Sequence, residues 1–276
     1  MPRAAAVTLP TLKLCKHANC GNIATGHDGS CFSHSRRKEL NSYSTAPTPR
    51  NTVKNPMGIE IECFNPDTVY KVTHVASCVS SDGSLPRNGG EIKLCCPEKK
   101  MEDAAADVVQ RSRMVGNVVD RNCGLHLHFK RPNVNFYDVA VKERMFKVVS
   151  AMQSFIFDIV PRSRKRNQYC GKINSEYDLD SHYAWLSLSS RHPTYEVRVH
   201  AGTMNPWKVK GWINAWTQVR PMIDKVIMGE DGWQDTVESL KHDGFLSVLN
   251  RNSIGYRYIL ARNINGGTLT NFGFNV

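Results

Sequence analysis

The feature that most constrains the fold is a strict alternation of apolar and ionisable residues in three short segments. They read GIEIE at 58–62, GLHLHF at 124–129 and YEVRVH at 195–200. Successive side chains of a β-strand point to opposite faces, so each segment would have one apolar face and one ionisable face. This pattern is typical of an antiparallel sheet that has a single covered face. A fourth segment, GGEIKL at 89–94, adds Glu91 after a flexible glycine pair.

Further patterns predict an α+β fold in which helices pack on one face of the antiparallel sheet. Strands are expected at 57–63, 69–77, 90–95, 123–130, 183–188 and 194–200. Helices are expected at 101–117, 137–160, 207–228 and 232–241. The second of these helices has a broad apolar stripe and ends before Pro161, which indicates that it packs against the core.

The composition excludes a membrane protein and favours an intracellular one. The 276 residues are 41% hydrophobic and 22% charged, as in ordinary globular proteins. No apolar run approaches the ~18 residues of a membrane span, and the N-terminal residues do not form a secretory signal. We therefore expect a cytoplasmic protein with no membrane partner. In that compartment nine cysteines favour thiols or metal ligands over disulfides.

Basic residues are concentrated near the N-terminus. Residues 1–54 contain eight Lys or Arg and two Asp or Glu, a net charge of +6 out of +11 for the chain. Such a bias favours a polyanionic partner such as nucleic acid. It is equally compatible with a role in solubility alone.

A cysteine-rich head, residues 1–40, precedes a linker at 41–55 and a body at 56–276. The linker is rich in Ser, Thr, Pro and Asn. The head has a C-x4-C-x10-C-x2-H array formed by Cys15, Cys20, Cys31 and His34. Four such ligands suit structural Zn²⁺, which would supply the folding energy of so small a module. His17 and His27 are competing ligands, and the stretch resembles the treble-clef-like modules of HNH-type endonucleases without a nuclease core behind it.

The ionisable strand faces of the body indicate a metal and phosphate site. Carboxylates that repeat along a strand face are costly to bury unless a cation neutralises them. A solvated face explains any single strand better, but it does not explain several strands that repeat His, Glu and Arg in the same pattern. Several glutamates with one or two histidines suit Mg²⁺ or Mn²⁺. Arg198, two residues from Glu196, fits a phosphate bridged to such a metal. Together these residues suggest phosphoryl transfer from a nucleotide.

The body also resembles the amidoligase family, carboxylate–amine ligases related in fold to glutamine synthetase and glutamate–cysteine ligase. The matching segments occur in the family's order between about residues 56 and 228. They are GIEIE, DGSL with GGEI, CGLHLHF, PRSRKRNQYC, YEVRVHAGTMN and WKVKGWINAW. Where members often have Arg-Tyr and Leu-Asn-Leu, this chain reads HYAWLSL, with His182 and Ser187 in their place.

The resemblance implies an antiparallel sheet whose concave face holds ATP with Mg²⁺ or Mn²⁺. The implied metal ligands are Glu60, Glu62, Glu91 and Glu196, with His126 or His128 completing the shell. The implied nucleotide contacts are Arg198, His128 and either Arg164 or Arg166. The implied catalytic residues are Glu62, Glu91, Arg198 and Asp82, the last positioning the amine or a metal-bound water.

The implied reaction joins a small-molecule or peptide carboxylate to an amine at the expense of ATP. The carboxylate would attack the γ-phosphate to form an acyl phosphate, and the amine would displace phosphate. Two or more Mg²⁺ ions would neutralise the phosphates and align the transfer. No covalent protein nucleophile is needed, so Cys123 and Cys170 are expected to be structural. Two alternatives are a zinc-containing nucleic-acid-binding protein with a non-catalytic body and a zinc hydrolase built on HLH. The hydrolase would require further ligands and a general base that the sequence does not offer.

Overall fold

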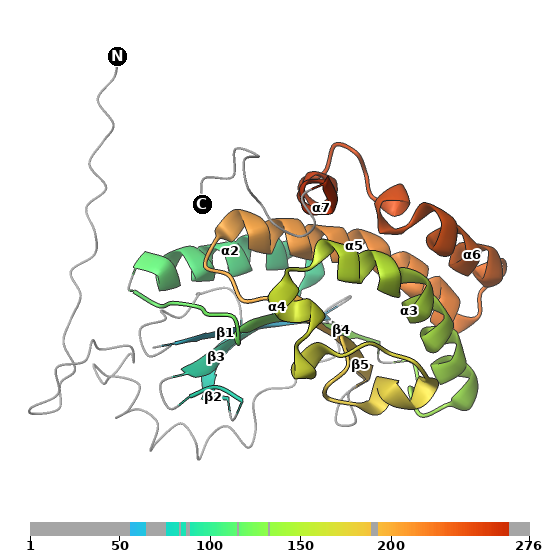
Figure 1. Ribbon diagram of the computed structural model, residues 1–276, viewed down its shortest axis with the longest axis horizontal. Helices are drawn as coiled ribbons and strands as arrows, with labels where there is room; N and C mark the ends of the chain where they lie inside the picture. Colours follow the sequence, from blue (N-terminus) through green and yellow to red (C-terminus); the bar gives the residue numbers. More distant parts are fainter. Residues whose placement is uncertain are drawn as a thin grey trace, which may run out of the picture.

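The computed structural model describes residues 56–64, 76–82, 84–86, 89–114, 116–131, 133–188 and 193–264. These residues form an α+β structure (Figure 1). Its strands are β1 (Pro56–Phe64), β2 (Ala76–Ser81), β3 (Gly89–Pro97), β4 (Gly124–Lys130), β5 (Leu186–Leu188) and β6 (Thr194–Ala201). Its helices are α2 (Glu98–Met114), α3 (Val139–Ile159), α4 (Arg162–Lys165), α5 (Pro206–Met228), α6 (Trp233–Asp243) and α7 (Ile254–Ile264). Short 3₁₀ helices are η3 (Gln168–Cys170), η4 (Glu176–Asp180) and η5 (Phe245–Val248).

The described strands form one antiparallel sheet in the order β2-β3-β1-β4-β6-β5. In this register Glu60 of β1 lies opposite Lys93 of β3 on one side and His126 of β4 on the other. His128 lies opposite Glu196 of β6. Residues that are directly opposite share a face of the sheet. The strand pairing alone therefore brings ionisable side chains from four strands to the same face.

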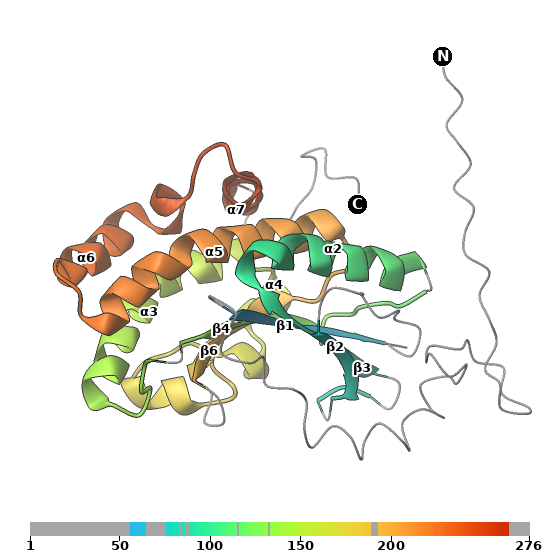
Figure 2. The same ribbon diagram turned by 180° about the vertical axis from the view of Figure 1, so that it is seen from behind.

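The other face of the sheet is apolar and is covered by helices. Figures 1 and 2 show α2, α3 and α5 lying across this face, with α6 and α7 outside them. The alternate residues of the central strands are completely or almost completely buried, including Ile59, Ile61, Leu125, Leu127 and Phe129. Three buried tryptophans, Trp185, Trp212 and Trp216, pack in the same layer. Burying each large apolar side chain contributes ~1.5–3 kcal/mol, so this layer is the main source of stability.

Helix α5 is the longest helix of the layer, and both of its ends are specified by sequence. The Asn205 side chain accepts hydrogen bonds from the backbone N–H groups of Trp207 and Lys208, and Pro206 occupies the first turn. Gly229, with φ 69°, ends the helix in the left-handed conformation. In its second turn, a Cβ at Gly211 would lie 2.6 Å from Cγ of Tyr258, so glycine allows α7 to pack closely on α5.

Most of the expected elements are confirmed, with ends that differ by a few residues. The strand expected at 69–77 overlaps β2 (Ala76–Ser81) only at residues 76 and 77, and its remainder lies outside the described residues. The strand expected at 183–188 is reduced to Leu186–Leu188. Helix α7 was not expected. Its apolar pattern is interrupted by Arg257 and by Arg262, which is nevertheless buried because it donates hydrogen bonds to Ile159 and Tyr258.

None of the helices among the described residues is long and apolar enough to cross a membrane. The head and linker, residues 1–55, lie outside the described residues. The zinc ligands expected there, Cys15, Cys20, Cys31 and His34, therefore remain a prediction.

Candidate functional site

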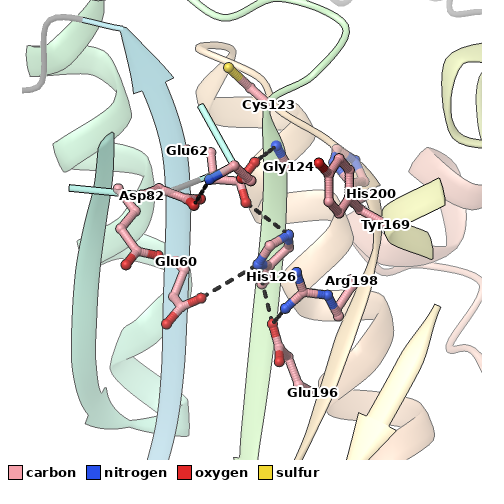
Figure 3. Close-up of polar contacts among 12 residues, drawn as sticks. Glu60, Glu62, Asp82, Cys123, Gly124, His126, Tyr169, Glu196, Arg198 and His200 are labelled. Carbon is pink, nitrogen blue, oxygen red and sulfur yellow. Dashed lines mark hydrogen bonds and ion pairs between the residues drawn. The ribbon is translucent and has the colours of Figure 1, made fainter. Parts of the chain in front are cut away.

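Ionisable side chains from four strands gather on the sheet face opposite the helices, and Figure 3 labels those that come from β1, β4 and β6. They are Glu60 and Glu62 of β1, Glu91 and Lys93 of β3, His126 and His128 of β4, and Glu196 and Arg198 of β6. We call this set the polar face. Glu62, His126, Glu196 and Arg198 are buried, whereas Glu60 and His128 are partly exposed. The strand alternation therefore brings together the carboxylates, histidines and arginine expected from the sequence.

Three of these residues are arranged to hold a metal ion. Glu60, His128 and Glu196 each offer one ligand atom, and these atoms lie within 4.8 Å of one another. Nε2 of His128 is buried and has no hydrogen-bond partner among the described residues, although it lies 3.4 Å from Glu60 Oε2 and 3.8 Å from Glu196 Oε1. A buried nitrogen that contacts two carboxylates without forming a hydrogen bond to either fits a divalent cation, and two oxygen donors with one imidazole suit Mg²⁺ or Mn²⁺.

His126 lies deeper, among three carboxylates. Its Nδ1 is 3.2 Å from Glu196 and 3.4 Å from Glu60, and its Nε2 is 3.4 Å from Glu62 (Figure 3). Burial opposes a charge on this ring, but hydrogen bonds with Glu196 and Glu60 outweigh burial and raise the pKa of His126 to about 9. Without a metal, a protonated His126 thus neutralises part of the negative charge. Of the two histidines expected as metal ligands, His128 belongs to the metal-competent triad and His126 lies beside it.

The four glutamates of the polar face divide into two electrostatic classes. For Glu60 and Glu196, burial favours the neutral acid, but hydrogen bonds and positive charge from the histidines outweigh it and lower the pKa of both carboxyls, that of Glu196 to about 2. For Glu62 and Glu91, burial prevails and raises the pKa of both, with further contributions from the charges of Asp82 and Glu60 respectively. The two carboxylates in the triad are therefore the ones that ionise most readily.

Glu62 is held in place by the backbone of β4. Its Oε2 accepts a hydrogen bond of 2.5 Å from the Gly124 N–H. Asp82 lies beside Glu62 (Figure 3), and its Oδ1 accepts a hydrogen bond from the Ser84 N–H at 2.8 Å. Two of the four expected catalytic residues, Glu62 and Asp82, thus lie beside each other at one end of the polar face.

Two buried arginines flank the carboxylates. Arg198 forms an ion pair with Glu196, whose other oxygen is 3.5 Å from Ser187 Oγ. Arg164 of α4 is 2% exposed, donates a hydrogen bond of 2.5 Å to the Cys123 carbonyl, and forms no salt bridge among the described residues. The Nε atoms of both arginines are buried and have no hydrogen-bond partner in the described part of the chain. Such unpaired donors suit an anionic ligand such as phosphate or carboxylate.

A glycine makes room for Arg164. A Cβ at Gly124 would lie only 2.6 Å from Nη2 of Arg164, so a larger residue would displace the guanidinium. Arg166 lies at the end of α4 and is exposed, and no contact with the polar face is found among the described residues. Of the two arginines left open by the sequence, Arg164 is therefore the one that reaches this region.

Lys93 is a residue of the polar face that sequence reasoning missed. Its Nζ lies 3.1 Å from Glu60 Oε1 and 2.6 Å from Glu91 Oε1. The same Glu91 oxygen accepts a hydrogen bond of 2.8 Å from Ser80. Lys93 was detectable, because in GGEIKL it follows Glu91 by two residues and alternation places both on one face.

Alternation along YEVRVH predicts that His200 shares a face with Glu196 and Arg198, and this prediction is wrong. Between Leu125 and Leu127 the pairing of β4 with β6 shifts, since β6 advances three residues while β4 advances two. This bulge turns His200 to the helix-covered face. There its ring packs 4.8 Å from that of Trp212, and its Nε2 lies 2.6 Å from the Tyr258 hydroxyl.

Comparison of the sequence with models of known protein families and with curated proteins finds no match.

Proposed function

We propose that the chain is an ATP- and Mg²⁺-dependent carboxylate–amine ligase of the amidoligase type. The observation that carries this proposal is the Glu60–His128–Glu196 triad, in which Glu196 is ion-paired with the buried Arg198 on the same sheet face. The buried Arg164 of α4 lies at the Gly124 end of the same region. Metal ligands next to cationic groups are what the binding of a nucleoside triphosphate requires. The resemblance of the ordered sequence segments to amidoligases supplies the reaction class.

Each part of the site would have a distinct task. Glu60, His128 and Glu196 would hold the divalent cation, which when bound neutralises phosphate charge and aligns the transfer. Arg198, kept in place by Glu196, would contact the transferred phosphoryl group through its planar guanidinium. Arg164 would bind a second anionic group, either a further phosphate or the substrate carboxylate.

The chain need not supply a nucleophile of its own. The substrate carboxylate attacks the γ-phosphate with ADP as the leaving group, and the amine then displaces phosphate from the acyl phosphate to form the amide. Cys123 and Cys170 are buried, and burial raises the pKa of both thiols, that of Cys123 to about 12. Neither thiol is therefore suited to nucleophilic attack, which agrees with a direct transfer between substrates.

Calorimetry of ATP binding with Mg²⁺ and with EDTA tests this proposal. Wild-type protein is expected to bind ATP only with Mg²⁺. Glu196→Gln should weaken that binding at least tenfold, whereas Glu238→Gln on exposed α6 should not change it. Equal ATP affinity in EDTA, or no affinity in either condition, would contradict the proposal. A positive result is followed by ATP turnover with panels of carboxylates and amines.

A further inference from the structure

Lys93 bridges two carboxylates of the polar face. Its ammonium lies 3.1 Å from Glu60 Oε1 and 2.6 Å from Glu91 Oε1, and its side chain is 39% exposed. The position is set by the sheet, because Lys93 lies directly opposite Glu60 in the β1–β3 register. A lysine ammonium is a compact point charge, comparable in this respect with a metal cation.

The two oxygens of Glu60 are divided between two cationic positions. Oε1 faces the Lys93 ammonium, whereas Oε2 faces the rings of His126 and His128. In a site with two metal ions, a carboxylate shared by both ions uses one oxygen for each. Oε2 of Glu60 therefore faces the metal-competent triad, whereas Oε1 already contacts the Lys93 ammonium.

Glu91 is occupied in the same way. Its Oε1 accepts from both Lys93 and Ser80, and Glu91 is not among the residues whose ligand atoms gather with those of Glu60, His128 and Glu196. A second divalent ion at Glu60 and Glu91 would have to displace the ammonium or lie against it. Repulsion between like charges at such short distances is large when both are partly shielded from water.

We propose that the Lys93 ammonium takes the place of a second metal ion, so that the polar face binds a single divalent cation at Glu60, His128 and Glu196. This inference rests on the metal site of the proposed function and does not require the ligase reaction. Because its side chain is partly exposed, Lys93 also presents its charge to a ligand that enters next to the metal. It thereby becomes a positioning residue for the phosphate groups of the nucleotide.

Counting bound Mn²⁺ by electron paramagnetic resonance of the full-length chain, without nucleotide, tests the inference. Glu196→Gln lacks one triad ligand, so its uptake gives the background from the rest of the chain. Above that background, wild type and Lys93→Arg are expected to bind one ion. Lys93→Met, which removes the charge but keeps a chain of similar length, is expected to bind two. Lys210→Met, which breaks the Lys210–Asp103 pair elsewhere, is expected to bind one.

Two ions in wild type, or one in a folded Lys93→Met, would overturn the inference. If Lys93→Met does not fold, the wild-type and Lys93→Arg counts still decide, because two ions in either would overturn it. These counts are independent of turnover. Single-ion binding in a chain that binds no ATP would refute the ligase and leave the role of Lys93 standing, whereas Mg²⁺-dependent ATP binding with two ions would do the reverse.

Discussion

The two faces of the sheet are built from the same strands and yet satisfy opposite requirements. On the helix-covered face, Ile59, Leu127 and Phe129 are fully or almost fully buried and have no charge to compensate. On the polar face, Glu60 and His126 alternate with them and are held by ion pairs and hydrogen bonds. The first face stabilises the fold, whereas the second keeps charges close together at a cost in desolvation. The proposed function gives these charges a bound cation and an anionic ligand to contact.

The largest change in stability is expected when a large side chain is removed from the apolar face. Phe129 lies opposite both Met57 and Tyr195, and its ring stacks 5.1 Å from that of Tyr195. Phe129→Ala should lower the free energy of unfolding by about 3–5 kcal/mol, through lost burial and the cavity that remains. Denaturant unfolding measures this. Tyr177→Ala, at a 78% exposed tyrosine, is the control and should change stability by less than about 0.5 kcal/mol. Similar losses in the two variants would remove the distinction.

On the polar face, the expected effect is on turnover. Arg198→Lys keeps the charge near Glu196 but loses the planar guanidinium group, which binds phosphate through two parallel hydrogen bonds. Turnover should fall about tenfold or more, which corresponds to ~1.4 kcal/mol in the transition state. Steady-state ATP hydrolysis measures it, with Arg257→Lys on the exposed side of α7 as the control. A large loss of stability with unchanged nucleotide affinity and turnover would identify Glu196–Arg198 as a structural ion pair.

The fold was largely predictable because one-sided burial imposes a period of two on the strands. This period identified β1, β4 and β6 and the residues on each face. It failed at His200, since a bulge changes the face of a residue without any local sequence signal. Helix α7 was missed because Arg262 interrupts its apolar pattern while being buried through hydrogen bonds. The choice between His126 and His128 as the metal ligand depends on side-chain positions that alternation does not determine.

His200 offers a smaller effect, and one that depends on pH. The residue lies on the apolar face, where burial lowers its pKa well below 6.5, with further contributions from the charges of Arg262, Arg164 and Lys208. Its neutral ring is held between the Ala201 carbonyl and the Tyr258 hydroxyl. Because the unfolded chain takes up this proton more readily, stability is complete above pH 6.5 and is lost as the pH falls below it. The loss for one such group is about 1 kcal/mol between pH 6.5 and 5.5.

Denaturant unfolding at several pH values, in wild type and in His200→Gln, isolates this contribution from other titrating groups. As the pH falls below 6.5, the unfolding free energy of wild type should decrease relative to that of His200→Gln. His242→Gln, at an exposed histidine of α6, is the control and should follow wild type at every pH. A pH-independent difference for His200→Gln would mean that His200 is not protected from protonation by its position on the apolar face.

The smallest effect on stability is expected for a substitution of Glu62. The sign of this change in unfolding free energy distinguishes the polar face from the apolar face most clearly. Glu62 is buried beside Asp82, so its negative charge is held at a cost in the metal-free protein. Glu62→Gln removes that charge and keeps an oxygen that accepts the Gly124 N–H. Although the position is buried, we expect an unfolding free energy equal to that of wild type or higher by up to ~1 kcal/mol, since His126 compensates only part of the cost of burying this charge. Denaturant unfolding in EDTA measures it against Glu238→Gln. A decrease in unfolding free energy of more than ~2 kcal/mol would show that Glu62 stabilises the fold as Phe129 does. The polar and apolar faces would then not differ in their contribution to stability.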